Sequence, residues 1–345
     1  MSQNHDKKML EIIETHESAS IQTIIAELDS ELSLATVKRV LKKLVEQDLI
    51  AVEGKGKSTK YKLSNAFKIL NTIDLETYYL KDIDDRKIID SFNFQIIEQL
   101  GAIQLFTKSE LEILEKQQEK FRQNVSQLSE VEYNKEMERL AIDLSWKSSQ
   151  IEGNTYSLLE TERLLKEKLT ADGKTKDEAT MLLNHKECID FILDHRDYLF
   201  PLKVSNLENI HRLLIKELGI GANIRKRRVG ISGTNYRPLD NEFQIREALE
   251  QVCQLINSKD SIFEQAFLAL LLISYIQPFE DGNKRTARIL SNALLINANY
   301  CPISFRTVDS IDYKKAMLVF YEQNNISAFK QIFIDQFEFA TETYF

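Results

Sequence analysis

The chain is short of the residues that break helices and of those that cross-link chains. Of its 345 residues, only 10 are glycine and 4 are proline. A sandwich or barrel of many short strands needs frequent turns, so this scarcity argues against those classes and favours helices. The three cysteines, Cys188, Cys253 and Cys301, are far apart and lack metal-ligand spacing. We therefore expect reduced, buried thiols and a cytoplasmic protein.

Long apolar runs are also missing. The longest, residues 266–276, is too short to span a bilayer and is typical of a buried core helix. The N-terminus has no apolar signal-peptide core, so we expect no membrane partner. A hydrophobic content of 43% and a charged content of 28% describe a globular chain, and its length allows two or three domains. The net charge of −8 argues against nucleic acid coating the whole surface, but not against a local basic patch.

Residues 1–64 are predicted to form a separate small domain. Apolar residues recur at helical spacing around Met9, after Ser20 and after Ser33, and both serines are suitable N-caps. Two short strands then flank a glycine-containing turn at residues 54–57. Three helices followed by a hairpin are typical of a winged helix-turn-helix.

The second half of this domain is strongly basic. Residues 38–62 carry eight basic and three acidic side chains, although residues 6–64 as a whole carry ten of each. Such a patch is the footprint expected for phosphate contacts with duplex DNA. The alternative is a protein–protein adaptor with solvated lysines. The predicted DNA-binding residues are Lys38, Arg39, Lys42 and Lys43 on the third helix and Lys55 and Lys57 on the wing.

The most informative segment spans residues 277–288, which read Gln-Pro-Phe-Glu-Asp-Gly-Asn-Lys-Arg-Thr-Ala-Arg. It lies between an apolar helix and a second helical pattern at residues 289–296. A loop rich in Gly, Asn and Asp that opens a basic helix can hold phosphates with backbone N–H groups and the positive end of the helix dipole. Arg285 and Arg288 lie three residues apart and so reach the same side of that helix. Asp281 is placed to hold a divalent cation between phosphates.

This segment resembles the signature of the Fic family, H-x-F-x-[DE]-G-N-[GK]-R-x-x-R. The resemblance covers roughly residues 140–340 and implies a mainly helical Fic-fold domain that binds ATP and transfers AMP to a protein hydroxyl. It implies a protein substrate of unknown identity, self-modification, and Mg²⁺ held by Asp281. It further implies an anion hole from the backbone of Gly282, Asn283 and Lys284, with the Asn283 side chain helping. By the same resemblance Arg285 contacts the phosphates, and Arg288 holds the γ-phosphate.

A second motif precedes the first. Ser148, Glu152 and Gly153 fit the Fic inhibitory pattern [ST]-x-x-x-E-[GN] at the end of a helix, with Gly153 expected just past its last turn. The resemblance implies that Glu152 pairs with Arg288 and keeps ATP in an unproductive pose. An ordinary helix end with a solvated carboxylate is the alternative.

Residues 225–238 are predicted to form a short β-hairpin. In Fic proteins this place is the flap, which pairs edge-on with an extended target segment. The resemblance assigns this role to Val229, Gly230, Ile231, Ser232 and Gly233. The alternative is a connecting hairpin with no partner.

Gln277 departs from the signature, which has the general-base histidine at this position. A carboxamide has no useful basicity near neutral pH, and loss of a positioned base costs on the order of 10² to 10⁴ in rate. Three explanations remain open: a pseudoenzyme that binds nucleotide, a variant inactivated by substitution, or a weak catalyst that uses substrate phosphate or water as base. Asn283 and Arg285 complete the predicted catalytic positions.

These patterns together predict a mainly α chain in three parts. Residues 1–64 form the winged helix-turn-helix, residues 65–107 a linker or helical region, and residues 108–345 a helical region with the inhibitory helix and the Fic-like core. The leading interpretation is an auto-inhibited protein adenylyltransferase that uses ATP and Mg²⁺. The alternative is a catalytically silent, nucleotide-sensing DNA-binding regulator. The oligomeric state stays open.

Overall fold

The computed structural model describes residues 2–28 and 32–345, apart from the side chains of residues 2–4 and 57. Its chain divides into two compact units. The N-terminal unit comprises residues 1–73 and 323–327, and the larger unit comprises residues 74–322 and 328–345. The first part of the N-terminal unit therefore ends at residue 73, whereas the sequence pattern ended this domain at residue 64. None of the helices among the described residues is long and apolar enough to cross a membrane.

The N-terminal unit has the three helices that the apolar spacing predicted, a further short helix (α4) and a small sheet. Ser20 and Ser33 cap their helices by accepting hydrogen bonds from the N–H groups of Thr23 and Thr36. The sheet order is β1-β3-β2, and Ile50 of β2 pairs with Leu63 of β3. The elements are α1 (Ser2–Thr15), β1 (Ala19–Ser20), α2 (Ile21–Glu27), α3 (Leu34–Glu46), β2 (Ile50–Glu53), a 3₁₀ turn (Gly56–Ser58), β3 (Lys60–Leu63) and α4 (Asn65–Leu70).

One face of each helix forms the core of this unit. Met9 and Ile13 from α1 pack with Leu41 and Leu44 from α3, and all four are buried. Strand β1, which the sequence pattern did not predict, adds Ala19 to this core. The expected winged-helix architecture is confirmed.

The larger unit is helical. Its elements are α5 (Leu75–Tyr79), α6 (Gln95–Ala102), α7 (Lys108–Val125), α8 (Glu130–Ile151), α9 (Leu158–Glu167), α10 (Lys176–Asp194), a 3₁₀ turn (Arg196–Leu199), α11 (Val204–Leu214), α12 (Glu242–Ser258), α13 (Ile262–Ile276), α14 (Asn283–Asn297), α15 (Ser310–Gln323) and α16 (Ser327–Thr343). Residues 108–151 form two helices, α7 and α8. Thr107 and Ser129 each form a capping box at the start of one of these helices.

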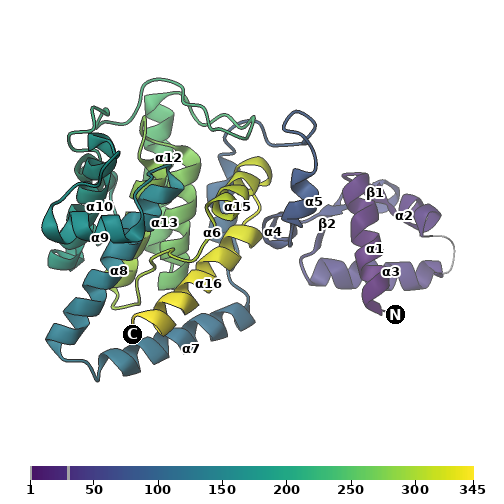
Figure 1. Cartoon of the computed structure of the whole chain (residues 1–345). Coiled ribbons are helices and arrows are strands. Elements are labelled where there is room, and N and C mark those ends of the chain that lie inside the picture. Colours follow the sequence, from purple (N-terminus) through teal and green to yellow (C-terminus); the bar gives the residue numbers. More distant parts are fainter. Residues whose placement is uncertain (1, 29–31) are drawn as a thin grey trace. The chain divides into compact units, whose positions relative to one another are not determined.

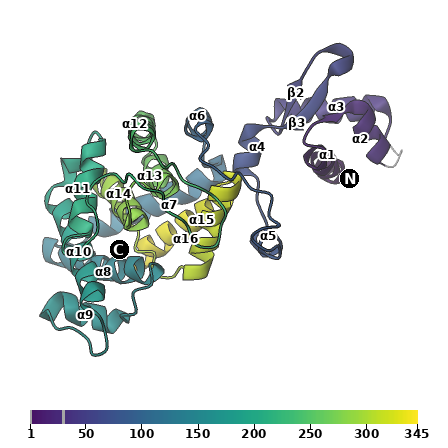
Figure 2. The ribbon, with the colours of Figure 1, turned by 90° about the horizontal axis from the view of Figure 1, so that it is seen from above.

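Helices α13 and α14 pack along each other in the middle of this unit, with α10 and α11 on one side and α15 and α16 on the other (Figures 1 and 2). Every residue of α13 from Ala266 to Ile276 is buried, which confirms the core helix expected from this apolar run. Helix α14 is almost as deeply buried although its first turns carry arginines. The centre of the unit therefore holds charged groups that need partners.

The expected hairpin at residues 225–238 is absent. This segment is irregular, with a turn at Ser232 and Gly233, and among the described residues it pairs only through an isolated parallel bridge between Ser91 and Arg237. The physical reason is that the segment pairs with another part of the chain. The N–H of Arg237 donates to the carbonyl oxygen of Asp90 at 2.9 Å, and Asn235 donates to the Asp84 carboxylate at 2.9 Å.

Arg86 fixes this segment from the region that the sequence left unassigned. Its guanidinium donates to the carbonyl of Gly233 at 3.0 Å and to the carboxylate of Glu322 at 3.1 Å. The side chains of Arg86 and Glu322 are 5% and 0% exposed, and Tyr78 also donates to Glu322. The irregular segment and the end of α15 are thus joined through one buried ion pair.

Removing Arg86 should destabilise the larger unit. Arg86→Ala leaves Glu322 buried and unpaired, which costs about 3–5 kcal/mol, and it frees residues 225–238 for tryptic cleavage. Urea unfolding and limited proteolysis measure the two effects. Lys81→Ala is the matched control, because Lys81 is exposed and lies in the same stretch of chain as Arg86. It should change neither the stability nor the cleavage. The double variant Arg86→Met, Glu322→Leu leaves no buried charge, so it should recover stability. It still lacks the Arg86 contact with Gly233, so residues 225–238 should remain sensitive to trypsin. Recovery of both properties would contradict the role of Arg86 in anchoring this segment.

Candidate functional site

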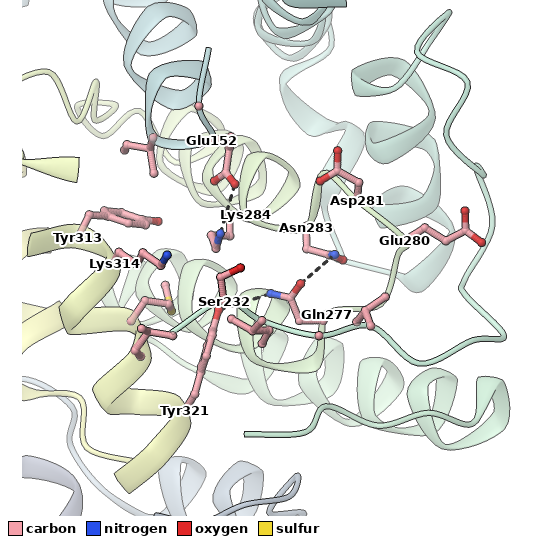
Figure 3. Close-up of a pocket in the computed structure, with 17 residues that line it drawn as sticks. Glu152, Ser232, Gln277, Glu280, Asp281, Asn283, Lys284, Tyr313, Lys314 and Tyr321 are labelled. Carbon is pink, nitrogen blue, oxygen red and sulfur yellow. Dashed lines mark hydrogen bonds and ion pairs between the residues drawn. The ribbon is translucent and has the colours of Figure 1, made fainter. Parts of the chain in front are cut away.

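A cavity of about 440 Å³ opens at the N-terminal end of α14 (Figure 3). This volume lies within the range of small-molecule sites. The lining comes from four places in the chain, which the fold brings together: the end of α8, the irregular segment at residues 229–232, the loop from α13 to α14, and α15. Of the residues singled out in the sequence, the cavity wall includes Glu152, Gly153, Val229, Gly230, Ile231, Ser232, Gln277, Asp281, Asn283 and Lys284.

Helix α14 begins without a side-chain cap. Gly282 is its N-cap residue and has φ +80°, a conformation that favours glycine. The first intrahelical bond runs from the N–H of Thr286 to the carbonyl of Gly282. The N–H groups of Asn283, Lys284 and Arg285 have no acceptor among the described residues. They form an open group of donors at the positive end of a helix dipole, which suits an anion.

The Asn283 side chain holds the loop and does not point toward a ligand. Its amide nitrogen donates to the Phe279 carbonyl at 2.9 Å and to Gln277 Oε1 at 3.0 Å, and its oxygen accepts from the Phe279 N–H at 2.8 Å. These bonds use both donor hydrogens and the carbonyl oxygen. The expectation that this side chain helps in the anion hole is therefore wrong for this conformation, while its backbone N–H is free for that role.

Two residues that sequence reasoning missed support the same loop from outside. Arg225 is buried, and its Nε donates at 2.6 Å to the carbonyl of Gln277, at the end of α13. A cation at a helix C-terminus is favourable because the carbonyl groups there are unpaired. His211 stacks on Phe279 with ring centroids 3.6 Å apart, and its Nε2 lies 2.9 Å from the carbonyl oxygen of Asp281. Burial lowers the pKa of His211 to about 4, so the ring is neutral and Nε2 can donate.

Gln277 is 8% exposed and has a left-handed backbone, with φ +52°. Its amide donates to the Ser274 carbonyl at 2.6 Å and accepts from Asn283 at 3.0 Å. Tyr321 lies on the other side, with its hydroxyl 3.5 Å from Gln277 Nε2. The side chain thus lines the cavity but is already engaged in the loop (Figure 3).

Glu152 contacts the two basic side chains that α14 sends toward it. Its Oε1 accepts from Arg288 at 2.9 Å, and its Oε2 accepts from Lys284 at 3.2 Å (Figure 3 draws the second contact). The expected pairing with Arg288 is present, and the carboxylate divides its two oxygens between Arg288 and Lys284. Burial acts to raise the pKa of Glu152, but the charges of Arg288 and Lys284 outweigh it and hold this pKa below its ordinary value.

Arg288 is fully buried and depends on α8 for its partners. Its Nε donates to Ser148 Oγ at 2.8 Å, and its Nη2 donates to the Ser148 carbonyl at 2.9 Å as well as to Glu152. Tyr313 of α15 lies beneath the guanidinium, 5.3 Å from ring centroid to carbon. Burial disfavours the charge, but Tyr313 and Glu152 raise the pKa of Arg288 above its ordinary value. Gly153 has φ +99° and ends α8, as expected from the sequence.

Arg285 and Asp281 form an ion pair of their own. Arg285 is 1% exposed and donates from Nη2 to the Asp281 carboxylate at 3.0 Å, while the Asp281 side chain is 60% exposed. Among the described residues, Asp281 belongs to no cluster of three or more metal-ligating side chains. One exposed carboxylate fits Mg²⁺, which proteins commonly hold through one or two carboxylates together with substrate phosphates.

The predicted DNA-binding residues lie in the N-terminal unit. Lys38, Arg39 and Lys42 on α3 and Lys55 before the 3₁₀ turn are exposed. Lys43 is half-buried and bound to the Asp6 carboxylate at 2.5 Å, so it is not a free phosphate ligand. The side chain of Lys57 lies outside what the structure describes.

Comparison with known proteins supports both parts of this arrangement. Residues 201–295 match the Fic/DOC family model, and residues 4–64 match the model of the penicillinase repressor family. The chain is 30% identical over 162 residues to protein adenylyltransferase Fic of Aedes aegypti and 31% identical over 162 residues to that of Culex quinquefasciatus. The alignments cover 44% of this chain but only 32% and 31% of those proteins, so the chain spans about a third of their length.

Solved structures show the same fold. Fic-1 (residues 134–508) from C. elegans superposes with a TM-score of 0.57 at 18% identity, covering 68% of this chain and 71% of that one. A Fic family protein from Desulfovibrio desulfuricans G20 gives 0.58 at 17% identity, covering 69% and 74%. The chain therefore carries a Fic-fold domain, in which residues 201–295 match the Fic/DOC family model, and an N-terminal winged-helix domain similar to penicillinase repressors.

Proposed function

We propose that the Fic-fold domain is a protein adenylyltransferase domain that binds ATP and Mg²⁺ and is restrained by Glu152. The observation that carries this proposal is the uncapped start of α14, where three N–H groups are free and Asn283 and Lys284 line the cavity. Fixed donors at such a position bind phosphate without rearrangement. The relatives named protein adenylyltransferase support the assignment of the reaction.

The proposed reaction joins a target hydroxyl to the α-phosphate of ATP. The hydroxyl oxygen forms a bond to the α-phosphorus, the bond from this phosphorus to the bridging oxygen breaks, and pyrophosphate leaves. Mg²⁺ bound at Asp281 would neutralise charge on the phosphates. The N–H groups of residues 283–285 would hold phosphate oxygens, and Arg285 and Arg288 would supply further positive charge. The target would lie along residues 229–233.

Gln277 limits this reaction because the hydroxyl proton needs an acceptor. The amide oxygen of Gln277 accepts from Asn283 and has no basicity near neutral pH. The chain as it stands is therefore proposed to bind nucleotide and to transfer AMP poorly.

Glu152 is proposed to restrain the site by charge and by occupancy. It places a carboxylate on Arg288, which ATP phosphates would use, and on Lys284 at the same helix start. A negative charge in this position also repels the phosphates. Ser148 would keep Arg288 in place when Glu152 is withdrawn.

The second candidate function is a DNA-binding regulator in which the Fic-fold domain senses nucleotide without transfer. Two observations favour it: the exposed basic residues of α3 and the match of residues 4–64 to the penicillinase repressor family. The buried, unpaired cysteines fit a reducing cytoplasmic setting for either function.

Glu152→Gly should tighten ATP binding about tenfold or more, because two cations are released and charged hydrogen bonds contribute roughly 1.5–3 kcal/mol each. Isothermal titration with ATP and Mg²⁺ measures the change. Glu138→Gly, an exposed position on the same helix, is the control and should leave the affinity unaltered. An unchanged or weaker affinity for Glu152→Gly would contradict the restraint.

Gln277→His in the Glu152→Gly background should raise AMP transfer, including self-modification, by about 10² to 10⁴, the range of a positioned general base. Incorporation of label from α-labelled ATP gives the rate. Gln277→Asn, which restores no base, is the matched control. A histidine variant that binds ATP normally but incorporates no label would rule out adenylyl transfer and leave the nucleotide-sensing regulator.

Lys38→Ala in the full chain should weaken binding to duplex DNA and lower the salt-dependence slope by about one, because each lost phosphate contact releases one counterion fewer. Electrophoretic shifts at several salt concentrations provide both values. Lys7→Ala on α1, which pairs with Glu11 and is 78% exposed, should change neither. An equal loss in both variants, or no shift at low salt, would argue for a protein-binding adaptor.

A further inference from the structure

The segment at residues 225–237 carries an unusually uniform charge. It contains five basic side chains, Arg225, Lys226, Arg227, Arg228 and Arg237, and the next acidic residue is Asp240. Arg225 is buried under the loop, whereas the other four are exposed. Four of the five positive charges are therefore exposed to solvent, next in the chain to residues that line the cavity.

The carboxylates that meet these side chains hold them weakly. Arg228 pairs with Asp240 and Lys226 with Glu242, and the basic partners are 81% and 76% exposed. Exposed ion pairs of this kind contribute little, about 0–1 kcal/mol each. Arg227 lies between these two residues and has no carboxylate partner in the part of the chain that the structure describes. An incoming acidic group can displace these contacts at small cost.

The backbone next to this charge is open. No N–H or C=O of residues 229–232 has a hydrogen-bonding partner among the described residues, although the same residues line the cavity. Ser232 and Lys314 point into the cavity near Gln277 (Figure 3). An extended segment that paired with residues 229–232 would place its own side chains between the arginines and the cavity.

The chain itself provides an example of what this segment binds. At its far end, Arg237 pairs in parallel with Ser91 and donates from its N–H to the Asp90 carbonyl, and its guanidinium contacts the Asp90 carboxylate. Asn235 holds Asp84 of the same stretch. The occupant of this end is thus an extended segment that carries acidic residues, bound by backbone pairing and by carboxylate contacts together.

We propose that residues 227–232 take a second extended acidic segment, from the target protein, in the same manner. The hydroxyl to be modified would lie at the cavity, and glutamates or aspartates beside it would contact Arg227, Arg228 and Lys314. This inference rests on the proposed function, and it adds a substrate class: hydroxyl side chains within acidic, extended stretches.

Two labelled peptides test the inference. Both have the same extended sequence centred on threonine, and one carries glutamates where the other carries lysines. Fluorescence anisotropy with the Glu152→Gly chain and saturating Mg²⁺–ATP should show about tenfold tighter binding of the acidic peptide at low salt, and this preference should shrink as salt screens it.

Reversing the charge of the segment should reverse the preference. Arg227→Glu with Arg228→Glu should favour the lysine peptide, whereas Lys108→Glu with Lys116→Glu on α7, which lines no part of the cavity, should keep the original order. Equal affinities, binding of neither peptide, or an unchanged order in the first variant would overturn the inference. Isothermal titration with ATP on the same proteins separates the outcomes, because intact ATP binding leaves the nucleotide site standing while lost ATP binding removes the proposed function itself.

Discussion

The turn from α13 into α14 is the constraint on which the site depends. Helix α13, buried without a break from Ala266 to Ile276, must end, and the chain must reverse and begin α14 with free N–H groups. The loop before Asn283 makes this whole turn. The Asn283 amide closes this loop on itself, Arg225 covers the end of α13, and neutral His211 supports the loop at Asp281. Because these contacts satisfy the loop internally, the first turn of α14 remains without a cap.

A helix start without a cap is costly unless something negative occupies it. Glu152 supplies negative charge nearby without reaching the backbone donors, since its oxygens go to Arg288 and Lys284. In the resulting site, the Arg288 and Lys284 side chains are paired with a carboxylate, while the backbone N–H groups of residues 283–285 have no acceptor among the described residues. The proposed restraint of ATP binding follows from this division: the phosphates would find their N–H donors free but their cations already paired.

Much of this arrangement could be predicted from the sequence, because the relevant signals are local. The caps at Ser20 and Ser33, the apolar run of α13, and Gly153 at the end of α8 all depend on neighbouring residues. The pairing of Glu152 with Arg288 came from a resemblance between motifs and could not have come from spacing, since the two residues are far apart in the chain. The sequence did not indicate that the Glu152 carboxylate contacts both Arg288 and Lys284, because this depends on how far α8 and α14 are shifted along each other.

Non-local contacts account for the other misses. Residues 225–238 have the glycines and alternation of a hairpin, but Asp84, Asp90 and Arg86 pull them into contact with another segment. His211 and Arg225 carry no local signal of their role, because each acts on a loop that lies far along the chain. The sequence also could not show that the Asn283 side chain forms its hydrogen bonds within the loop, to Phe279 and Gln277. An asparagine at the start of a helix fits a ligand contact and a structural contact equally well.

The most direct test of the account is a crystal structure of the Glu152→Gly chain with ATP and Mg²⁺. We predict that phosphate oxygens lie within hydrogen-bonding distance of the N–H groups of residues 283–285, with Arg288 still held by Ser148. ATP bound elsewhere, or no ATP in the crystal at saturating concentration, would contradict the claim that the start of α14 is a nucleotide site.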